Sequence, residues 1–393
     1  MEIGHVAAKD PVQPTSMNRV LKVNRKTPAA QWNRRILKTL SPALEKDPEA
    51  DLLSVLPNFY SKTLAGLREG TTEPKLPKKT YQPELPRPEL PRRDTRSLLQ
   101  ESDTAIIVST LSDDVKKLLT VDDDLPRAIK ELLGRSEVLF QYPHGFSTMV
   151  LRASEAIAVK VTRDVDNITE YTSMQYLWDQ KPSIPAPRPL GLVKMGKFYL
   201  IFMTFISGLD LEEAWPQLED HQKRDISSQL DVILSDLRSL PFPKNQSLGG
   251  VQGEGCKDAR RNIRASSTPI MSPKEFEDFI FSNPNCGSSV YLKFLRSFCP
   301  SDQPVPECVF THGDIRPANI KVTQNEDGSW KVLGRMDWEY SGFYPAYWES
   351  LKATNNLSSI EGSDWYLYLP RCISPLQYPK RWLLDRVWDH HVA

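Results

Sequence analysis

Residues 310–320 combine a carboxylate and a carboxamide in one short polar segment. The run Phe310-Thr-His-Gly-Asp-Ile-Arg-Pro-Ala-Asn-Ile320 begins and ends with apolar residues and places Asp314 five residues before Asn319. Gly313 and Pro317 favour a loop, from which both polar side chains can point into a cleft. The carboxylate can orient an attacking hydroxyl group, and the amide oxygen can ligate Mg²⁺. The segment therefore predicts a metal-assisted reaction of a hydroxyl group.

A second carboxylate and a lysine extend this candidate set. Asp337 ends an expected strand that begins at Lys331, so it lies at a rim position that suits another magnesium ligand. Lys160 lies in an expected strand, within the run Ile157-Ala-Val-Lys160, in which alternate residues face opposite ways, so its ammonium can face the cleft and meet phosphate oxygens. Glu170, ten residues further on in the next expected helix, can hold that ammonium in place.

The elements that must position these residues change from strands to helices along the chain. Runs rich in β-branched and apolar residues predict a small antiparallel sheet over 138–142, 146–152 and 156–162. Apolar residues at helical spacing predict helices over 126–133, 167–180 and 219–240. One more apolar strand is expected over 198–205.

The domain organisation follows from this order. A sheet-rich small lobe at 95–205 and a mostly helical large lobe at 206–393 form an α+β fold with a cleft between the lobes. Residues 1–94 differ, because six prolines stand between Glu73 and Arg93 and the pentad PELPR occurs there twice in succession. This composition suits polyproline II geometry. We expect a partly disordered N-terminal extension ending in a stiff linker, for which a weak peptide-ligand role is the less favoured alternative.

Charge and cysteine usage restrict the partners and the location. Fifty basic residues balance fifty acidic ones, so no net field recruits nucleic acid or an anionic membrane. The acid-free stretch between Pro11 and Leu44 is read as a solvated basic tail, although a mitochondrial presequence is a less favoured alternative. The longest apolar run, 198–206, is far shorter than the roughly 20 residues that a spanning helix needs. The five cysteines show no C-x-x-C spacing, and we expect a monomeric cytoplasmic protein with reduced thiols.

The candidate residues resemble the catalytic core of a known family. His312-Gly-Asp314 with Asn319, followed by Asp337-Trp-Glu339, is similar to the core of the aminoglycoside phosphotransferase and choline kinase-like family, which has the bilobal protein kinase-like fold. Ile157-Ala-Val-Lys160 matches the nucleotide-binding lysine strand of that family. The run DWEY-x-G-x-YP-x-YWE, which begins at Asp337, is shared with fungal phosphotransferase-family proteins of unassigned substrate.

The resemblance implies ATP and Mg²⁺ as cofactors and a role for each candidate residue. It implies Asp314 as the catalytic base, Asn319 and Asp337 as magnesium ligands, and Lys160 on the α- and β-phosphates with Glu170 as its partner. The expected reaction is in-line transfer of the γ-phosphoryl group to a hydroxyl of a small molecule.

The adenine end of the nucleotide is assigned in the same way. Ile201-Phe-Met-Thr204 resembles the hinge between lobes, where the backbone of Met203 and its neighbours would bind the adenine edge.

Two departures from the family pattern leave alternatives open. The hairpin expected over the phosphates has only Gly145 and no G-x-G-x-x-G, and Arg335 stands where an aliphatic residue is usual. A non-catalytic pseudokinase that binds a nucleotide or a partner protein is therefore one alternative. A protein serine/threonine kinase is another, disfavoured because Asp337 leads directly into an aromatic segment with no room for an activation segment. His312 and the aromatic residues after Asp337 are expected to be structural.

Overall fold

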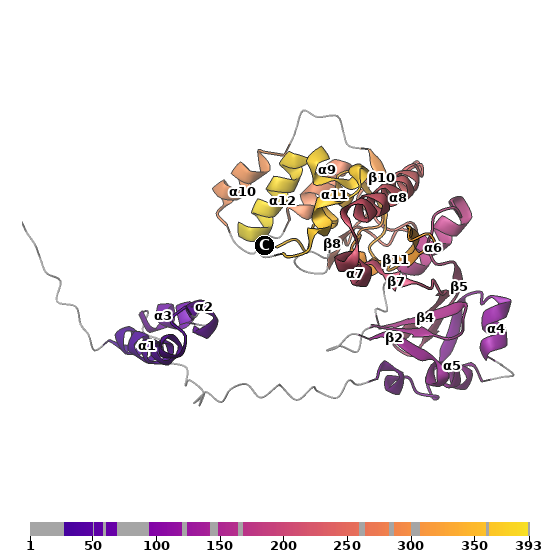
Figure 1. Ribbon diagram of the computed structural model, residues 1–393, viewed down its shortest axis with the longest axis horizontal. Coiled ribbons are helices and arrows are strands. Elements are labelled where there is room, and N and C mark those ends of the chain that lie inside the picture. The colour runs from indigo at the N-terminus through magenta and orange to yellow at the C-terminus, as the bar shows by residue number, and fades with distance from the viewer. Residues whose placement is uncertain are drawn as a thin grey trace, which may run out of the picture. The chain divides into compact units, whose positions relative to one another are not determined.

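The chain divides into two compact units, Met1–Leu90 and Pro91–Ala393, which are described separately. The computed structural model describes residues 27–49, 51–57, 60–68, 94–119, 124–141, 148–163, 168–258, 264–282, 287–299, 307–358 and 361–391 (Figure 1). The proline-rich segment and Gly145 lie outside these residues. The boundary expected between residues 94 and 95 stays a prediction.

The described part of the first unit is helical. Its helices are α1 Pro28–Lys46, α2 Leu52–Val55 and α3 Tyr60–Arg68. The side chain of Thr27 caps the start of α1, and Pro28 stands in its first turn, where a missing backbone N–H costs nothing. Trp32 and Ile36 of α1 pack with Leu67 of α3 in a small buried cluster.

The second unit begins with a six-stranded antiparallel sheet. Its spatial order is β1-β5-β6-β4-β3-β2. The strands are β1 Ala105–Ser109, β2 Glu137–Gln141, β3 Thr148–Arg152, β4 Ile157–Thr162, β5 Pro189–Met195 and β6 Phe198–Thr204. The predicted strands β2, β3, β4 and β6 are confirmed, whereas β1 and β5 are additional.

The two faces of this sheet pack against different partners. Val159 and Phe202 face α4 Asp113–Leu119 and α5 Leu125–Arg135 within one buried cluster. Ala158 and Ile201 belong to a second cluster with α6 Thr169–Gln180 and the large lobe. Because strand residues alternate between faces, Lys160 shares the face of Ala158 and points toward α6.

The large lobe is mostly helical and carries several short ladders. Its helices are α7 Leu211–Ala214, α8 Asp220–Arg238, α9 Pro273–Ile280, α10 Ser289–Arg296, α11 Trp348–Lys352 and α12 Pro379–His391. Its strands are β7 Leu209–Asp210, β8 Lys257–Asp258, β9 Arg264–Ala265, β10 Cys308–Thr311, β11 Ile320–Gln324, β12 Trp330–Arg335 and β13 Gly342–Pro345. Short 3-10 turns are η1 Thr95–Leu98 in the small lobe and η2 Trp215–Gln217, η3 Pro317–Asn319, η4 Asp364–Leu367, η5 Arg371–Ile373 and η6 Pro375–Gln377 here.

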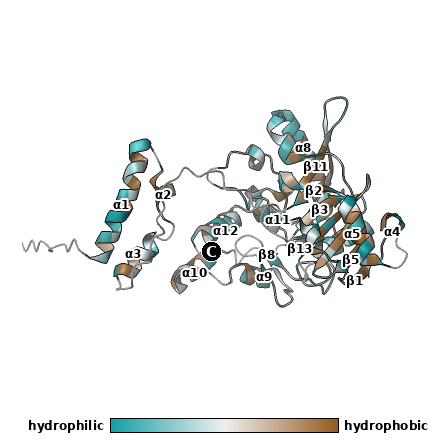
Figure 2. Ribbon diagram, turned by 90° about the horizontal axis from the view of Figure 1, so that it is seen from below, coloured by the Kyte–Doolittle hydropathy of each residue, from teal (hydrophilic) through white to brown (hydrophobic). Residues whose placement is uncertain are grey.

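The long helix α8 supports these ladders from the core. Hydrophilic and hydrophobic residues lie along it together (Figure 2), and its buried stripe consists of Ile226, Leu230, Leu234 and Leu237. This spacing of three to four residues places one apolar face against the core, as the sequence predicts over 219–240. The α+β fold with a sheet-rich lobe followed by a helical lobe is thus confirmed.

Two of the short ladders position the candidate loops. In β10–β13, Thr311 lies opposite Gly342, and in β11–β12, Ile320 lies opposite Arg335. The segment 312–319 therefore leaves and enters strands whose partners flank residues 336–341, so the two polar loops lie side by side. None of the helices in the described ranges has the length and apolarity that crossing a membrane requires.

Candidate active site

The loop that carries Asp314 is fixed at its base by Glu349 of α11. The Glu349 carboxylate accepts hydrogen bonds from the backbone N–H groups of His312 at 2.6 Å and Gly313 at 3.0 Å. Glu349 is buried. Gly313 has φ +84°, and a Cβ at this position would lie 2.4 Å from the Tyr340 carbonyl oxygen. Only glycine suits both the backbone angle and this contact.

His312 is a buried neutral group within the same loop. Its Nδ1 accepts a hydrogen bond from the Asp314 backbone N–H at 3.2 Å, and its Nε2 lies 3.0 Å from the Met336 carbonyl oxygen. A neutral ring with the proton on Nε2 satisfies both contacts. Burial, helped by Arg335, lowers the pKa of His312 to about 3. His312 therefore joins the two polar loops and is structural, as the sequence predicts.

Asp314 and Asn319 are in direct contact. Asn319 Nδ2 donates to Asp314 Oδ2 at 2.8 Å and to the Asp314 carbonyl oxygen at 3.0 Å. Arg316 Nε lies 3.2 Å from the same carboxylate oxygen. Burial raises the pKa of Asp314, although Arg316 opposes the change. Since the amide nitrogen of Asn319 faces Asp314, its amide oxygen is the atom that can ligate a metal.

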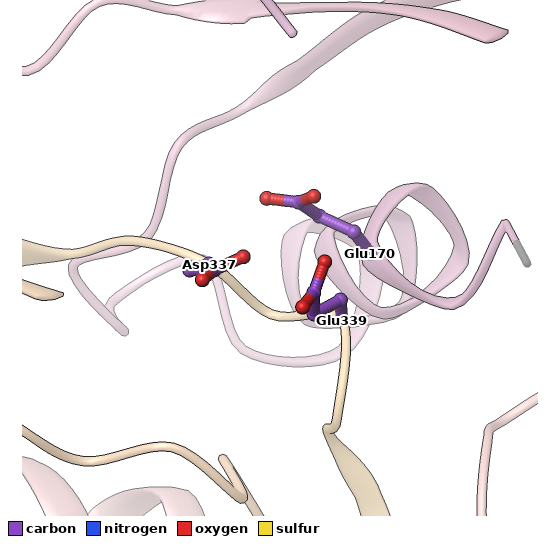
Figure 3. A group of neighbouring side chains, drawn as sticks. All are labelled: Glu170, Asp337 and Glu339. Atoms are coloured by element: carbon purple, nitrogen blue, oxygen red, sulfur yellow. The ribbon is translucent and has the colours of Figure 1, made fainter. Parts of the chain in front are cut away.

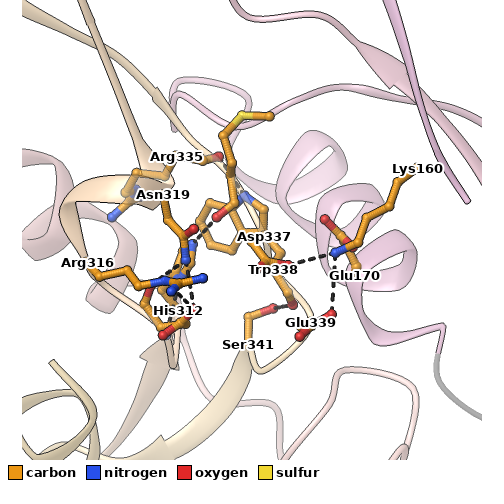
Figure 4. Close-up of polar contacts among 12 residues, drawn as sticks. Lys160, Glu170, His312, Arg316, Asn319, Arg335, Asp337, Trp338, Glu339 and Ser341 are labelled. Atoms are coloured by element: carbon orange, nitrogen blue, oxygen red, sulfur yellow. Dashed lines mark hydrogen bonds and ion pairs between the residues drawn. The ribbon is translucent and has the colours of Figure 1, made fainter. Parts of the chain in front are cut away.

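Lys160 lies at the centre of three carboxylates. Its Nζ is 2.6 Å from Glu170 Oε2, 2.7 Å from Asp337 Oδ1 and 3.4 Å from Glu339 Oε2 (Figure 4). Lys160 is only 6% exposed, so water screens these ion pairs weakly. Burial lowers the pKa of Lys160, but the three carboxylates outweigh it and raise that pKa well above its usual value.

The three carboxylates themselves carry more negative charge than Lys160 balances. Oxygen atoms of Glu170, Asp337 and Glu339 all lie within 4.8 Å of one another (Figure 3). Burial raises the pKa of Glu170 and of Glu339, whereas the adjoining Lys160 ammonium keeps the pKa of Asp337 low against the effect of burial. A hard divalent cation with oxygen ligands fits such a donor set.

The turn that follows β12 holds Asp337 in an unusual backbone conformation. Asp337 has φ +66°, in the left-handed region that aspartate tolerates better than most residues. The turn is fixed by the Met336 N–H, which donates to the Asn319 carbonyl oxygen at 2.9 Å, and by Trp338 Nε1, which donates to the Arg335 carbonyl oxygen at 2.9 Å. Such strain is often found where a side chain must be aimed for function.

The side chain of Arg335 lies in the core rather than in the site. It is fully buried, and its guanidinium carbon is 5.2 Å from the centre of the Trp338 ring. Figure 4 shows it on the far side of Asp337 from Lys160. Burial lowers the pKa of Arg335 to about 10, and its nitrogens have no hydrogen-bond partner within the described residues.

The remaining predicted residue, Met203, lies in β6 at a distance from the charged cluster along the strand. It is opposite Ala158 in β4 and its side chain is buried. The register places it on the same sheet face as Lys160. Its adenine-binding role stays a prediction.

The structure adds residues that sequence reasoning does not assign to the site. Glu339 contacts Lys160, Arg316 contacts Asp314, and Glu349 holds the loop backbone. Glu339 and Glu349 both belong to the conspicuous aromatic run, and the two-residue spacing from Asp337 to Glu339 is a signal that could have indicated Glu339. Nothing in the local sequence indicates that Glu349 reaches the loop.

A family model decides the relationship of the chain to known proteins. Residues 133–371, more than half of the chain, match the model of the phosphotransferase enzyme family. The chain belongs to this family. The resemblance proposed from the sequence is confirmed, and with it the coarse class of activity, a kinase-type phosphotransferase. No sequence among curated proteins matches this phosphotransferase family member.

Several solved structures are similar at low identity. A thermostable mutant of aminoglycoside phosphotransferase APH(4)-Ia, in ternary complex with AMP-PNP and hygromycin B, has 13% identity, covers 71% of this phosphotransferase and 87% of its own chain, and has a TM-score of 0.43. Aminoglycoside-3'-phosphotransferase of type VIII has 15% identity, covers 67% of this phosphotransferase and 97% of its own chain, and has a TM-score of 0.42. ADP-bound aminoglycoside phosphotransferase APH(2'')-Ib has 13% identity, covers 70% of this phosphotransferase and 88% of its own chain, and has a TM-score of 0.41. The family assignment rests on the family model.

Proposed function

We propose that this phosphotransferase transfers the γ-phosphoryl group of ATP to a hydroxyl of a small molecule and that it requires Mg²⁺. The observation that carries the proposal is the convergence of Lys160, Glu170, Asp337 and Glu339 from three separate parts of the sequence. Residues that are distant in sequence rarely bury several like charges together without a functional reason.

The charge balance of the cluster supports a magnesium nucleotide as its ligand. One ammonium faces three carboxylates, and ATP would add further negative charge. Asp337 and the amide oxygen of Asn319 would hold Mg²⁺, with Glu339 beside them as a further oxygen donor. When bound, Mg²⁺ would neutralise charge on the transferring phosphoryl group.

The protein groups divide the remaining work. Lys160, held by Glu170, would turn its ammonium toward the α- and β-phosphates. Asp314, held by Asn319 and Arg316, would accept the hydrogen bond of the attacking hydroxyl and fix its direction. The backbone of Met203 and its neighbours would bind the adenine edge. Most of the catalysis would be positioning and electrostatic stabilisation.

The short connection after Asp337 favours a small-molecule acceptor over a protein. β13 begins at Gly342, and the intervening turn is closed by Ser341 Oγ, which donates to the Trp338 carbonyl oxygen at 2.5 Å. An activation segment that would bind a protein substrate has no room there. The buried position of Arg335 removes one reason to consider a pseudokinase. A monomeric state and a cytoplasmic location belong to the same proposal.

Turnover by the purified full-length chain tests the proposal. The protein is incubated with ATP labelled in the γ-phosphate, with and without Mg²⁺, against a panel of hydroxylated metabolites and a casein-like protein. We expect Mg²⁺-dependent label in a small molecule and its loss in Asp314→Ala. Label in casein would favour a protein kinase, whereas thermal stabilisation by ATP without any turnover would favour a pseudokinase.

A further inference from the structure

A segment of the large lobe, residues 249–258, lies between α8 and α9 and is fixed firmly to the core. Gly249 exchanges two backbone hydrogen bonds of 2.8 Å with Phe343 of β13. The Lys257 backbone N–H donates to the Tyr344 hydroxyl at 3.0 Å, and Tyr344 is fully buried. The segment therefore moves with the large lobe and with the ladder that precedes α11.

Two side chains of this segment reach α6, the helix that carries Glu170. Lys257 Nζ donates to Thr169 Oγ1 at 2.7 Å, and Thr172 Oγ1 donates to the carboxylate of Glu254. Thr169 and Thr172 flank Glu170 on the first turn of the helix. The helix is thus tied to the segment on both sides of the residue that pairs with Lys160.

The same ammonium also holds the loop that follows β12. Lys257 Nζ donates to the backbone carbonyl oxygen of Glu339 at 2.9 Å. Lys257 is only 9% exposed, so both hydrogen bonds are largely shielded from water. One side chain therefore connects the helix that carries Glu170 with the loop that carries Asp337 and Glu339.

We propose that Lys257 is a positioning residue that holds α6 and the 337–339 loop at the separation at which their three carboxylates meet around Lys160. Without the bridge the helix and the loop lose one of the two described connections between them, the other being the ion pairs of Lys160, so their separation is less firmly fixed. The carboxylates then no longer converge, and the phosphates and Mg²⁺ lose their common binding geometry. A misplacement of about 1 Å can reduce a rate by roughly a hundredfold. The inference rests on the proposed function, because it concerns the geometry of that site.

The bridge predicts a specific pattern of loss in Lys257→Met. We expect kcat/KM for ATP to fall about tenfold to a hundredfold, with a higher Mg²⁺ concentration needed for half-maximal activity. Binding of adenosine, which lacks phosphates, should be unchanged. Lys257→Arg, which keeps a cation able to bridge, should recover part of the loss. Lys197→Met, at an exposed lysine in the β5–β6 turn, is the matched control and should behave as the unaltered protein.

Thr169→Val tests the bridge with the lysine retained. Thr169 is fully buried and valine fills nearly the same volume, so the variant removes the hydroxyl without opening a cavity, and a folded variant can carry the resulting loss of stability. It should raise the Mg²⁺ requirement in the same direction. The double variant should be no worse than Lys257→Met alone, because both changes break one bridge. Additive losses would overturn the proposal.

The remaining outcomes separate this inference from the proposed function. Equal loss of adenosine and MgATP binding in Lys257→Met, or an unchanged Mg²⁺ requirement, would mean that Lys257 only stabilises its own segment. If the unaltered protein shows no Mg²⁺-dependent ATP binding, the proposed function fails. In that case hydrogen exchange still tests whether Lys257 stabilises α6. The backbone amides of α6 should exchange faster in Lys257→Met than in Lys197→Met, and equal rates would refute the bridge.

Discussion

Removal of the Lys160 ammonium provides the most informative perturbation of the site. In the unaltered protein the two nearest carboxylates lie 2.6 and 2.7 Å from the Lys160 ammonium. In Lys160→Met the three carboxylates remain together with no cation among them. Breaking a buried ion pair by removing one partner costs about 3–5 kcal/mol. For a domain of this size that loss lowers the melting temperature by roughly 5–15 °C. A control is Lys116→Met, whose exposed pair with Asp113 should contribute about 0–1 kcal/mol.

The pH dependence of that loss has a definite sign. In the unaltered protein the pKa of Asp337 is lowered by Lys160, so its contribution to stability is present above the usual value of 3.8 and is lost as the pH falls. In Lys160→Met the carboxylate pKa values rise, the folded state binds more protons than the unfolded chain, and stability recovers as the pH falls from neutral toward those raised values.

The assay is thermal unfolding of both proteins across pH 5–8, with and without Mg²⁺. We expect the difference in melting temperature between the unaltered protein and Lys160→Met to shrink at acid pH. Mg²⁺ should stabilise the variant more than the unaltered protein, because it replaces the missing positive charge. A difference that is constant with pH and insensitive to Mg²⁺ would refute the charge-cluster reasoning.

Three further predictions concern the Asp314 loop. Asp314→Asn should reduce kcat by about 10²–10⁴-fold while leaving the affinity for ATP, measured by calorimetry, nearly unchanged; equal loss of affinity would argue against a role confined to the acceptor. Gly313→Ala should lower the melting temperature and abolish turnover, because its Cβ would lie 2.4 Å from the Tyr340 carbonyl oxygen; an alanine variant as stable as the original would contradict the observed loop. The pKa of the buried His312 is lowered from 6.5 to about 3, so the free energy of unfolding should decrease as the pH falls through this range. In His312→Gln this decrease should be smaller, as measured by denaturant titration at each pH.

The contacts of the candidate site that could be predicted from the sequence lie within one loop or between consecutive elements of the chain. Asp314 and Asn319 stand five residues apart in one loop, and their contact follows from that spacing. Lys160 faces α6 because strand residues alternate, and Glu170 lies on the next helix. The strands β2, β3, β4 and β6 follow equally directly from their apolar runs.

Other features depend on contacts that local patterns do not encode. Glu349 accepts a hydrogen bond from His312, which lies 37 residues earlier in the sequence. Lys257 donates to Thr169, which lies 88 residues earlier. The strand β5 escapes prediction because it begins at Pro189 and has an irregular register at Gly191, which breaks the two-residue alternation. The sequence does not tell on which face of its strand the side chain of Arg335 lies, and only tertiary packing places it on the buried face.

Calorimetric titration of ATP, with and without Mg²⁺, on the unaltered protein and on Asp337→Asn would show whether these residues bind a magnesium nucleotide. We expect Mg²⁺ to strengthen ATP binding by at least about tenfold in the unaltered protein, and we expect this effect to disappear in the variant, since one carboxylate ligand is lost. ATP binding that is the same with and without Mg²⁺ in the unaltered protein would contradict a magnesium nucleotide site at these residues.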